Sequence, residues 1–142
     1  MLLAVVTLTL SSISRFESVS KVPRYSKSVL LVDDSHSDLL LFKRLLEKAH
    51  FRVIATSNAD AALSSIVSGD IGCLVTDQVM QISSQELLSL VRSVRSDVGV
   101  IFISGADAPR EPLPPGIVFI RKHDKKKLIE MVASCMSKYR AA

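Results

Sequence analysis

Apolar residues recur along the chain in two alternating patterns. Short runs rich in valine, isoleucine and leucine, typical of buried strands, occupy residues 28–34, 51–57, 71–77, 98–105 and 116–122. Segments whose apolar positions recur with helical spacing occupy residues 37–49, 58–69, 83–94 and 124–139. This alternation predicts an α/β fold with a parallel sheet covered on both faces. We expect a doubly wound, five-stranded sheet with strand order 2-1-3-4-5.

Local signals support these boundaries. Ser35, with Asp38 three residues later, resembles a capping box and predicts the start of the first helix. Gly69 stands where the second helix should end.

The first 27 residues differ in composition from the rest. Ten mostly apolar residues are too few to cross a bilayer, and no basic segment precedes them as in a secretory signal. The serine-rich, basic stretch that follows has the composition of an organelle transit peptide but also of a disordered leader, and a start assigned too early is a further explanation. We therefore expect a leader over residues 1–27, one domain over 28–139 and a tail over 140–142, with no membrane association.

Charge and cysteine content exclude several classes of function. The net charge is +4, but residues 1–27 carry four Lys or Arg against one Glu, which leaves the remainder nearly neutral. A nearly neutral domain argues against a broad nucleic-acid footprint. Cys73 and Cys135 form neither a metal motif nor a disulfide framework, and we expect both to be reduced and buried. The three histidines show no zinc-ligand spacing.

Polar residues follow four of the five predicted strands. Asp33 and Asp34 follow the first strand, Asp77 the third, Ser104 the fourth and Lys122 the fifth. In this topology the carboxyl ends of the first and third strands meet at the ligand-binding edge. One acid there would need no explanation beyond the helix dipole, and Lys122 or Ser104 alone could be a solvated or turn residue. Their convergence instead favours an oxygen cage for Mg²⁺.

The segments "VDDS", "LVTDQVM", "FISG" and "FIRK", in this order, resemble the receiver domain of two-component response regulators over residues 28–139. The resemblance implies a flavodoxin-like receiver fold and Mg²⁺ as cofactor. It implies that Asp77 is both the phosphoacceptor and a Mg²⁺ ligand, and that Asp34 is a direct Mg²⁺ ligand. Asp33 would act mostly through water, and the backbone carbonyl of Val79 would be a third ligand.

The same resemblance assigns the switch. Ser104 corresponds to the hydroxyl that bonds the phosphoryl group, Lys122 to the lysine that pairs with it, and Phe119 to the aromatic residue that turns inward. Val79 and Ala106 stand where polar side chains position a hydrolytic water in the family. Neither can hold one, so we expect slow self-dephosphorylation and no other enzymatic activity.

Two departures from the family pattern concern loops. His123 follows Lys122 where receivers usually have proline, often after a cis bond, and a cis bond before a residue other than proline costs about 2.5–4 kcal/mol. The sequence leaves the state of this bond open. Residues 106–116 contain four prolines and no apolar period, so we expect the fourth helix to be deleted or reduced to a turn.

We expect a stand-alone cytoplasmic receiver that accepts a phosphoryl group from a sensor histidine kinase or a histidine phosphotransfer protein. Too few residues follow the last helix for a DNA-binding output domain. Without a regular fourth helix we expect a monomer, which signals by protein–protein contacts. The basic run 121–127 would suit an acidic partner, although these lysines are equally consistent with a solvated surface.

Two other functions stay open. One is a degenerate pseudo-receiver that acts only as a partner-binding module. The other is a small Mg²⁺-dependent phosphatase with Asp77 as nucleophile. Such an enzyme would have a second acid two residues after Asp77, and Val79 at this position argues against it.

Overall fold

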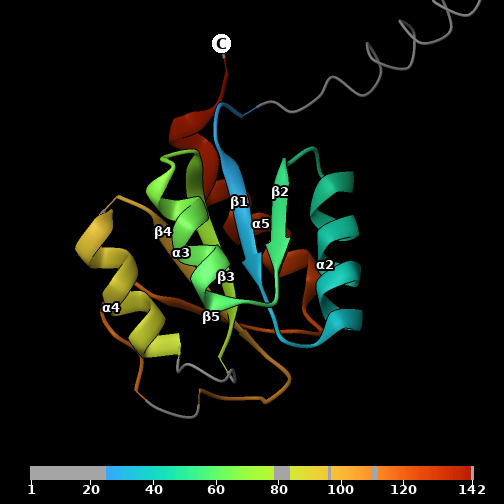
Figure 1. Ribbon diagram of the computed structural model, residues 1–142. Coiled ribbons are helices and arrows are strands. Elements are labelled where there is room, and N and C mark those ends of the chain that lie inside the picture. Colours follow the sequence, from blue (N-terminus) through green and yellow to red (C-terminus); the bar gives the residue numbers. More distant parts are fainter. Residues whose placement is uncertain (1–24, 79–83, 96, 110–111, 142) are drawn as a thin grey trace, which may run out of the picture.

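The computed structural model describes residues 25–78, 84–95, 97–109 and 112–141. Within them, five strands form one parallel sheet with the order β2-β1-β3-β4-β5 (Figure 1). The strands are β1 (Ser28–Val32), β2 (Val53–Thr56), β3 (Ile71–Asp77), β4 (Gly99–Ser104) and β5 (Val118–Arg121). The helices are α2 (His36–Lys48), α3 (Ala59–Val67), α4 (Ser84–Val94), α5 (Lys125–Met136) and the short 3₁₀ helix η1 (Ser137–Tyr139). The predicted fold class and strand order are confirmed.

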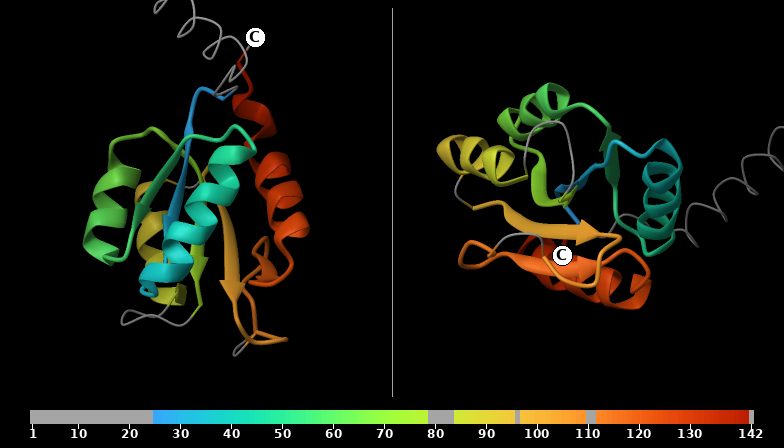
Figure 2. Two further views of the ribbon diagram at one scale, coloured as in Figure 1. Left: turned by 90° about the vertical axis from the view of Figure 1, so that its right-hand side faces the viewer. Right: turned by 90° about the horizontal axis from the view of Figure 1, so that it is seen from below.

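Helices cover both faces of the sheet (Figure 2). Successive residues of β1 point to opposite faces, so Val29 and Leu31 pack with α2 and α5, whereas Leu30 and Val32 pack with α3 and α4. Every residue of β1 and β3 is buried, because both strands lie in the middle of the sheet with a helix layer on each side. Two apolar cores, one on each face, therefore fix the position of the two central strands.

The helix boundaries follow the predicted local signals. Ser35 caps α2, and its hydroxyl accepts a hydrogen bond of 3.4 Å from the backbone N–H of Asp38. Gly69 follows α3 with φ of +88°, a conformation that glycine adopts without steric cost. His50, just beyond α2, adopts the left-handed conformation with φ of +72° and is exposed, as expected for a loop histidine.

No helix lies between β4 and β5 in the described residues 105–109 and 112–117. Instead, Leu113 and Ile117 pack against the α3–α4 core, as does Phe119 on β5. Two apolar side chains from the described residues between β4 and β5 thus pack on this core, where the sequence predicted that the fourth helix would be deleted or reduced to a turn. None of the helices in the described part of the chain combines the length and apolar character of a membrane span.

The two ends of the described domain meet. Tyr25 forms an isolated antiparallel bridge with Arg140, and the backbone N–H of Ser26 donates to the carbonyl of Tyr139 at 2.8 Å. The ring of Tyr25 also stacks on that of Phe51, with 5.0 Å between the ring centroids. The chain therefore enters and leaves the domain at one place.

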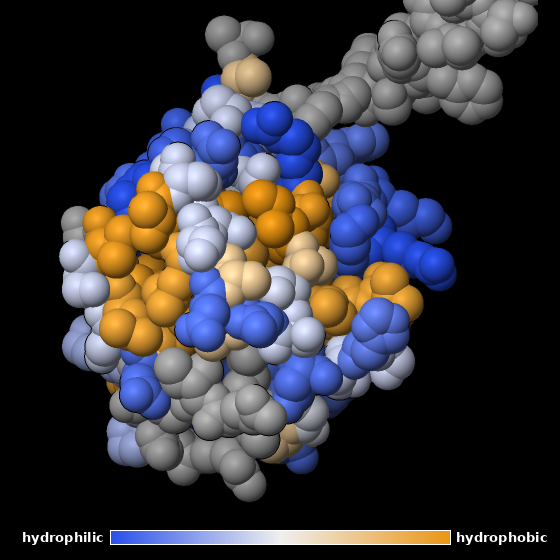
Figure 3. All heavy atoms as spheres, viewed as in Figure 1, coloured by the Kyte–Doolittle hydropathy of each residue, from blue (hydrophilic) through white to orange (hydrophobic). Residues whose placement is uncertain are grey.

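Several large aliphatic side chains remain exposed on the helices. Val67 on α3 is 65% exposed, and Leu90 and Val94 on α4 are also exposed. Figure 3 shows apolar surface over α3 and α4 on this face of the molecule. Such a surface offers contact area but no acid–base or metal chemistry.

The cysteines depart from the sequence prediction in one respect. Both are free thiols, and Cys73 is fully buried, but Cys135 on α5 is only half-buried. Cys135 packs directly against β3 and β4, because Gly72 and Gly99 present no side chain there. A Cβ on Gly99 would overlap the Sγ of Cys135.

We predict that Gly99→Ala destabilises the protein by about 1–3 kcal/mol, because the added methyl group forces Cys135 and α5 away from the sheet. Removing Sγ should relieve the overlap, since the Cβ of Cys135 lies 3.6 Å from the position of the new methyl carbon. Gly99→Ala with Cys135→Ala should therefore regain part of the loss. The free energy of unfolding in urea measures both effects.

Gly105→Ala serves as the matched control, because a Cβ at Gly105 meets no atom within 4 Å. It should leave the unfolding midpoint unchanged or slightly raised. Equal midpoints for Gly99→Ala and Gly105→Ala would contradict the close packing of α5.

Candidate functional site

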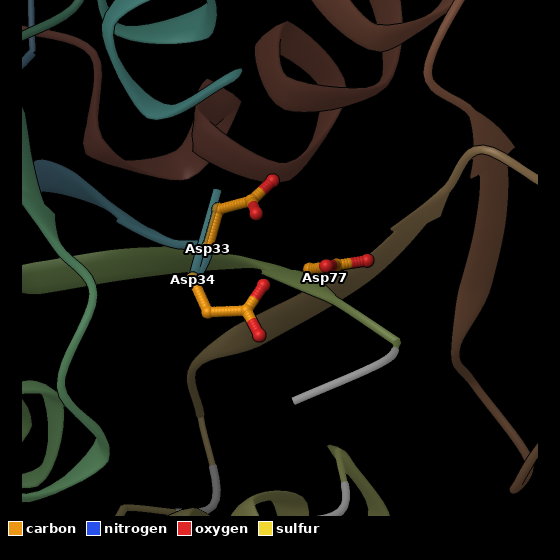
Figure 4. A group of neighbouring side chains, drawn as sticks. All are labelled: Asp33, Asp34 and Asp77. Carbon is orange, nitrogen blue, oxygen red and sulfur yellow. The ribbon is translucent and has the colours of Figure 1, made fainter. Parts of the chain in front are cut away.

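Three aspartates meet at the carboxyl edge of the sheet. Asp33 and Asp34 follow β1 directly, and Asp77 is the last residue of β3. Val32 is paired with Thr76 in the parallel register, so the two strands end side by side. One carboxylate oxygen from each aspartate lies within 4.8 Å of the other two (Figure 4). No other group of three His, Cys, Asp or Glu residues is this compact among the described residues.

The three carboxylates differ in their surroundings. Asp33 is fully buried and Asp77 is 6% exposed, whereas Asp34 is exposed. Oδ1 of Asp33 accepts a 2.9 Å hydrogen bond from the backbone N–H of Ser35. Oδ2 of Asp33 is buried and accepts no hydrogen bond in the described structure. A buried anionic oxygen without a donor is costly, so this position favours a neighbouring cation.

Lys122 supplies one cation. Its Nζ lies 2.8 Å from Oδ2 of Asp33 and 3.6 Å from Oδ2 of Asp77. Because Asp33 Oδ2 accepts no hydrogen bond, the shorter contact is an ion pair without hydrogen-bond alignment. Burial alone would lower the pKa of Lys122, but its contacts with Asp33 and Asp38 and the charge of Asp77 raise that pKa above its ordinary value. The ammonium group therefore stays charged at physiological pH.

Asp38 joins the same cluster, which the sequence analysis did not foresee. Nζ of Lys122 donates to its Oδ2 at 2.8 Å. In a full capping box this carboxylate would accept from the N–H of Ser35, but that N–H donates to Asp33 instead. The only signal was position: Asp38 lies in the first turn of a helix that begins at the ligand edge.

The remaining predicted residues lie around this cluster. Ser104, at the end of β4, is 2% exposed, and its Oγ accepts a 3.0 Å hydrogen bond from the N–H of Ala106. Its carbonyl accepts from the N–H of Lys122 at 2.7 Å, which joins the ends of β4 and β5. Phe119 on β5 is half-buried beside the proline-rich segment. The predicted ligand Val79 lies outside the described residues.

The loop after Lys122 resolves one open question. The described residues contain no cis peptide bond, so the bond between Lys122 and His123 is trans. Lys122 is not a solvated surface lysine like others in the run 121–127, because its side chain points into the carboxylate cluster.

The donor set fits a hard divalent cation. All three candidate ligands are carboxylates, one is exposed, and one buried oxygen lacks a hydrogen-bond donor. Mg²⁺ and Ca²⁺ bind to oxygen ligands of this kind, and Mg²⁺ commonly uses one or two carboxylates and keeps several waters. The site can therefore hold a divalent cation among the three carboxylates, close to the ammonium group of Lys122.

Comparisons with known proteins point to one family. The sequence matches the profile of the response regulator receiver domain over residues 29–133. The chain is similar to the crystal structure of the receiver domain from the hybrid histidine kinase CckA, with 27% identity, a TM-score of 0.66, and coverage of 77% of this chain and 98% of that one.

Further solved structures share the fold. A response regulator receiver protein from Sinorhizobium medicae WSM419 is 24% identical with a TM-score of 0.68, covering 81% of this chain and 98% of that one. A receiver domain protein from Clostridium thermocellum is 20% identical with a TM-score of 0.70, covering 79% and 95%. No curated protein matches the sequence.

We predict that Lys122→Met destabilises the protein by about 3 kcal/mol in the absence of divalent cations. The change leaves Asp33 and Asp77 buried without the ammonium group that offsets their charges. The free energy of unfolding at neutral pH, measured in urea with a chelator present, reports this loss. Lys126→Met is the control, because Lys126 is exposed and lies outside the cluster. If both variants unfold at the same urea concentration, Lys122 does not stabilise the carboxylates.

Proposed function

This chain belongs to the response regulator receiver domain family, and we propose that it is the phosphoacceptor of a two-component His–Asp phosphorelay, switched by Mg²⁺-dependent phosphorylation of Asp77. Domains of this family generally act as phosphorylation switches rather than as classical enzymes. We assign Asp33, Asp34, Asp77 and the Val79 carbonyl to Mg²⁺ binding, and Ser104 and Lys122 to the phosphoryl group.

The observation that carries this proposal is the meeting of three carboxylates within 4.8 Å beside Lys122. Asp77 is the member of this cluster that ends the central strand β3, next to the end of β4 with Ser104. A carboxylate so placed can attack phosphorus while a hydroxyl and an ammonium group are at neighbouring strand ends.

The proposed step transfers one phosphoryl group. An Oδ of Asp77 forms a bond to phosphorus as the bond from phosphorus to the donor nitrogen of a phosphohistidine breaks, and the donor keeps the electron pair. The bound Mg²⁺ would neutralise charge on the phosphoryl oxygens. Lys122 contributes a positive charge to the same oxygens, and the buried position of Asp77 limits access of water.

The switch follows from new acceptor oxygens at Asp77. The Ser104 hydroxyl accepts from Ala106 in the described state, and its own proton is free to be donated to a phosphoryl oxygen. A shift of Ser104 toward Asp77 would open space near Phe119, which is half-buried and packs against the α3–α4 core. We therefore assign Ser104 and Phe119 to the element that changes state on phosphorylation.

Receiver domains interact with histidine kinases or histidine phosphotransfer proteins, and we propose one of these as the phosphodonor. We also propose a cytoplasmic monomer that signals by protein contacts and does not bind DNA itself. The described residues contain no helix between β4 and β5. This supports a monomer, because a regular helical face for dimerisation is missing there. Lys125, Lys126 and Lys127 are exposed and suit an acidic partner.

We predict that incubation with Mg²⁺ and a small phosphodonor such as acetyl phosphate adds one phosphoryl group to the wild type. Asp77→Asn should abolish the adduct and keep the fold, because the amide has the same shape but is a poor nucleophile. Intact-mass spectrometry detects the adduct, and circular dichroism checks the fold.

The same experiment separates the alternatives. A lasting adduct supports the switch, continuous turnover of the donor supports a phosphatase, and no adduct supports a pseudo-receiver. Labelling of Asp77→Asn to the wild-type extent would show that the phosphoacceptor is a different residue.

For Mg²⁺ binding we predict a difference between the neighbouring aspartates. Asp34 is exposed, whereas Asp33 is already engaged by Ser35 and Lys122. Asp34→Ala should therefore raise the dissociation constant for Mg²⁺ more than Asp33→Ala, by a further factor on the order of ten. Isothermal titration calorimetry measures the constants, and Asp60→Ala, in the first turn of α3, controls for loss of one acid. Equal losses at Asp33 and Asp34 would refute their separate roles.

A further inference from the structure

Asp38 and Lys122 connect two parts of the chain that are 84 residues apart. Asp38 lies in the first turn of α2, and Lys122 lies directly after β5. Their contact is a hydrogen bond of 2.8 Å between charged groups, shorter by 0.8 Å than the 3.6 Å from Nζ to Asp77. In the unmodified protein the ammonium group is therefore held nearer to Asp38 than to the residue that we propose is phosphorylated.

The surroundings of Asp38 allow its contact with Lys122 to break at little cost. Its side chain is 36% exposed, so water can solvate the carboxylate when Lys122 leaves. Asp33, the other close partner of Lys122, is fully buried, and its Oδ2 has no hydrogen-bond donor to replace the ammonium group. When Lys122 turns toward new oxygens on Asp77, the contact with Asp38 is thus the less costly one to break.

We propose that Asp38 is a positioning residue that holds Lys122 in the resting state and competes with the phosphoryl group for its ammonium. This inference rests on the proposed function of Asp77. A phosphoryl group adds strong acceptor oxygens beside Asp77, and its bond to Lys122 forms at the expense of the bond to Asp38. Asp38 therefore sets how strongly the phosphorylated state is favoured, although it does not touch the reacting atoms.

The test uses beryllofluoride, a phosphoryl mimic, with the full chain and Mg²⁺. Asp38→Asn should bind the mimic roughly three- to tenfold more tightly than the wild type, because Lys122 loses its charged resting partner. Asp60→Asn removes the same charge from the first turn of α3 and should bind as the wild type does. Isothermal titration calorimetry gives the affinities, and urea unfolding of both variants corrects for any loss of helix stability.

A second comparison separates positioning from simple charge repulsion. In a Lys122→Met background, Asp38→Asn should change the affinity for the mimic by less than about twofold. A gain that persists without Lys122 would overturn the positioning role and leave only repulsion between two anions. The comparison of Asp38→Asn with Asp60→Asn needs no variant at Lys122, so equal affinities of these two variants would refute the role of Asp38 even if Lys122→Met does not fold.

The outcomes also distinguish this inference from the function on which it rests. If the wild type binds the mimic, Asp77→Asn does not, and Asp38→Asn binds as the wild type does, the role of Asp38 is refuted and the proposed function stands. If the wild type fails to bind the mimic, the proposed function is refuted, and the role of Asp38 with it.

Discussion

Repulsion between carboxylates at the end of a parallel sheet is the constraint on which this structure depends. Asp33, Asp34 and Asp77 are brought together by the register of β1 and β3, and two of them are withdrawn from water. At low dielectric, such charges raise the energy of the fold unless positive charge is present. Lys122 supplies only one such charge against three carboxylates, so a divalent cation at this site would offset more of the repulsion.

The fold provides the rigidity that holds these charges in place. The two central strands are buried along their whole length, and α5 approaches the sheet closely over Gly72 and Gly99. The end of β5 is tied to β4 through the N–H of Lys122 and the carbonyl of Ser104. Beyond this framework, the proline-rich segment covers the apolar core with Leu113 and Ile117 rather than with a helix. Buried strands thus hold the carboxylates, and the half-buried Phe119 packs against the same core as the irregular segment.

The sequence was sufficient for the fold and for most of the site, because strand order alone determines which strand ends meet. It predicted Asp33, Asp34, Asp77, Ser104 and Lys122 at one edge, where the structure places them. It could not predict the contact between Asp38 and Lys122, since an acid in the first turn of a helix is explained by capping until the tertiary structure brings Lys122 within reach. Nor could it show that Cys135 is half-buried, because the burial of Cys135 depends on how α5 packs over Gly72 and Gly99, which are distant in the sequence.

The bridge between Tyr25 and Arg140 has a consequence for how this domain can be attached to anything else. Both residues lie at the pole of the sheet opposite the aspartates, where β1 begins and α5 ends (Figure 1). A tether, surface or fluorescent label joined near either residue leaves the carboxyl edge clear for a docking protein. A force applied to both attachment points at once would act first on the bridge between Tyr25 and Arg140. This contact would therefore break before the strand ends that carry the carboxylates are disturbed.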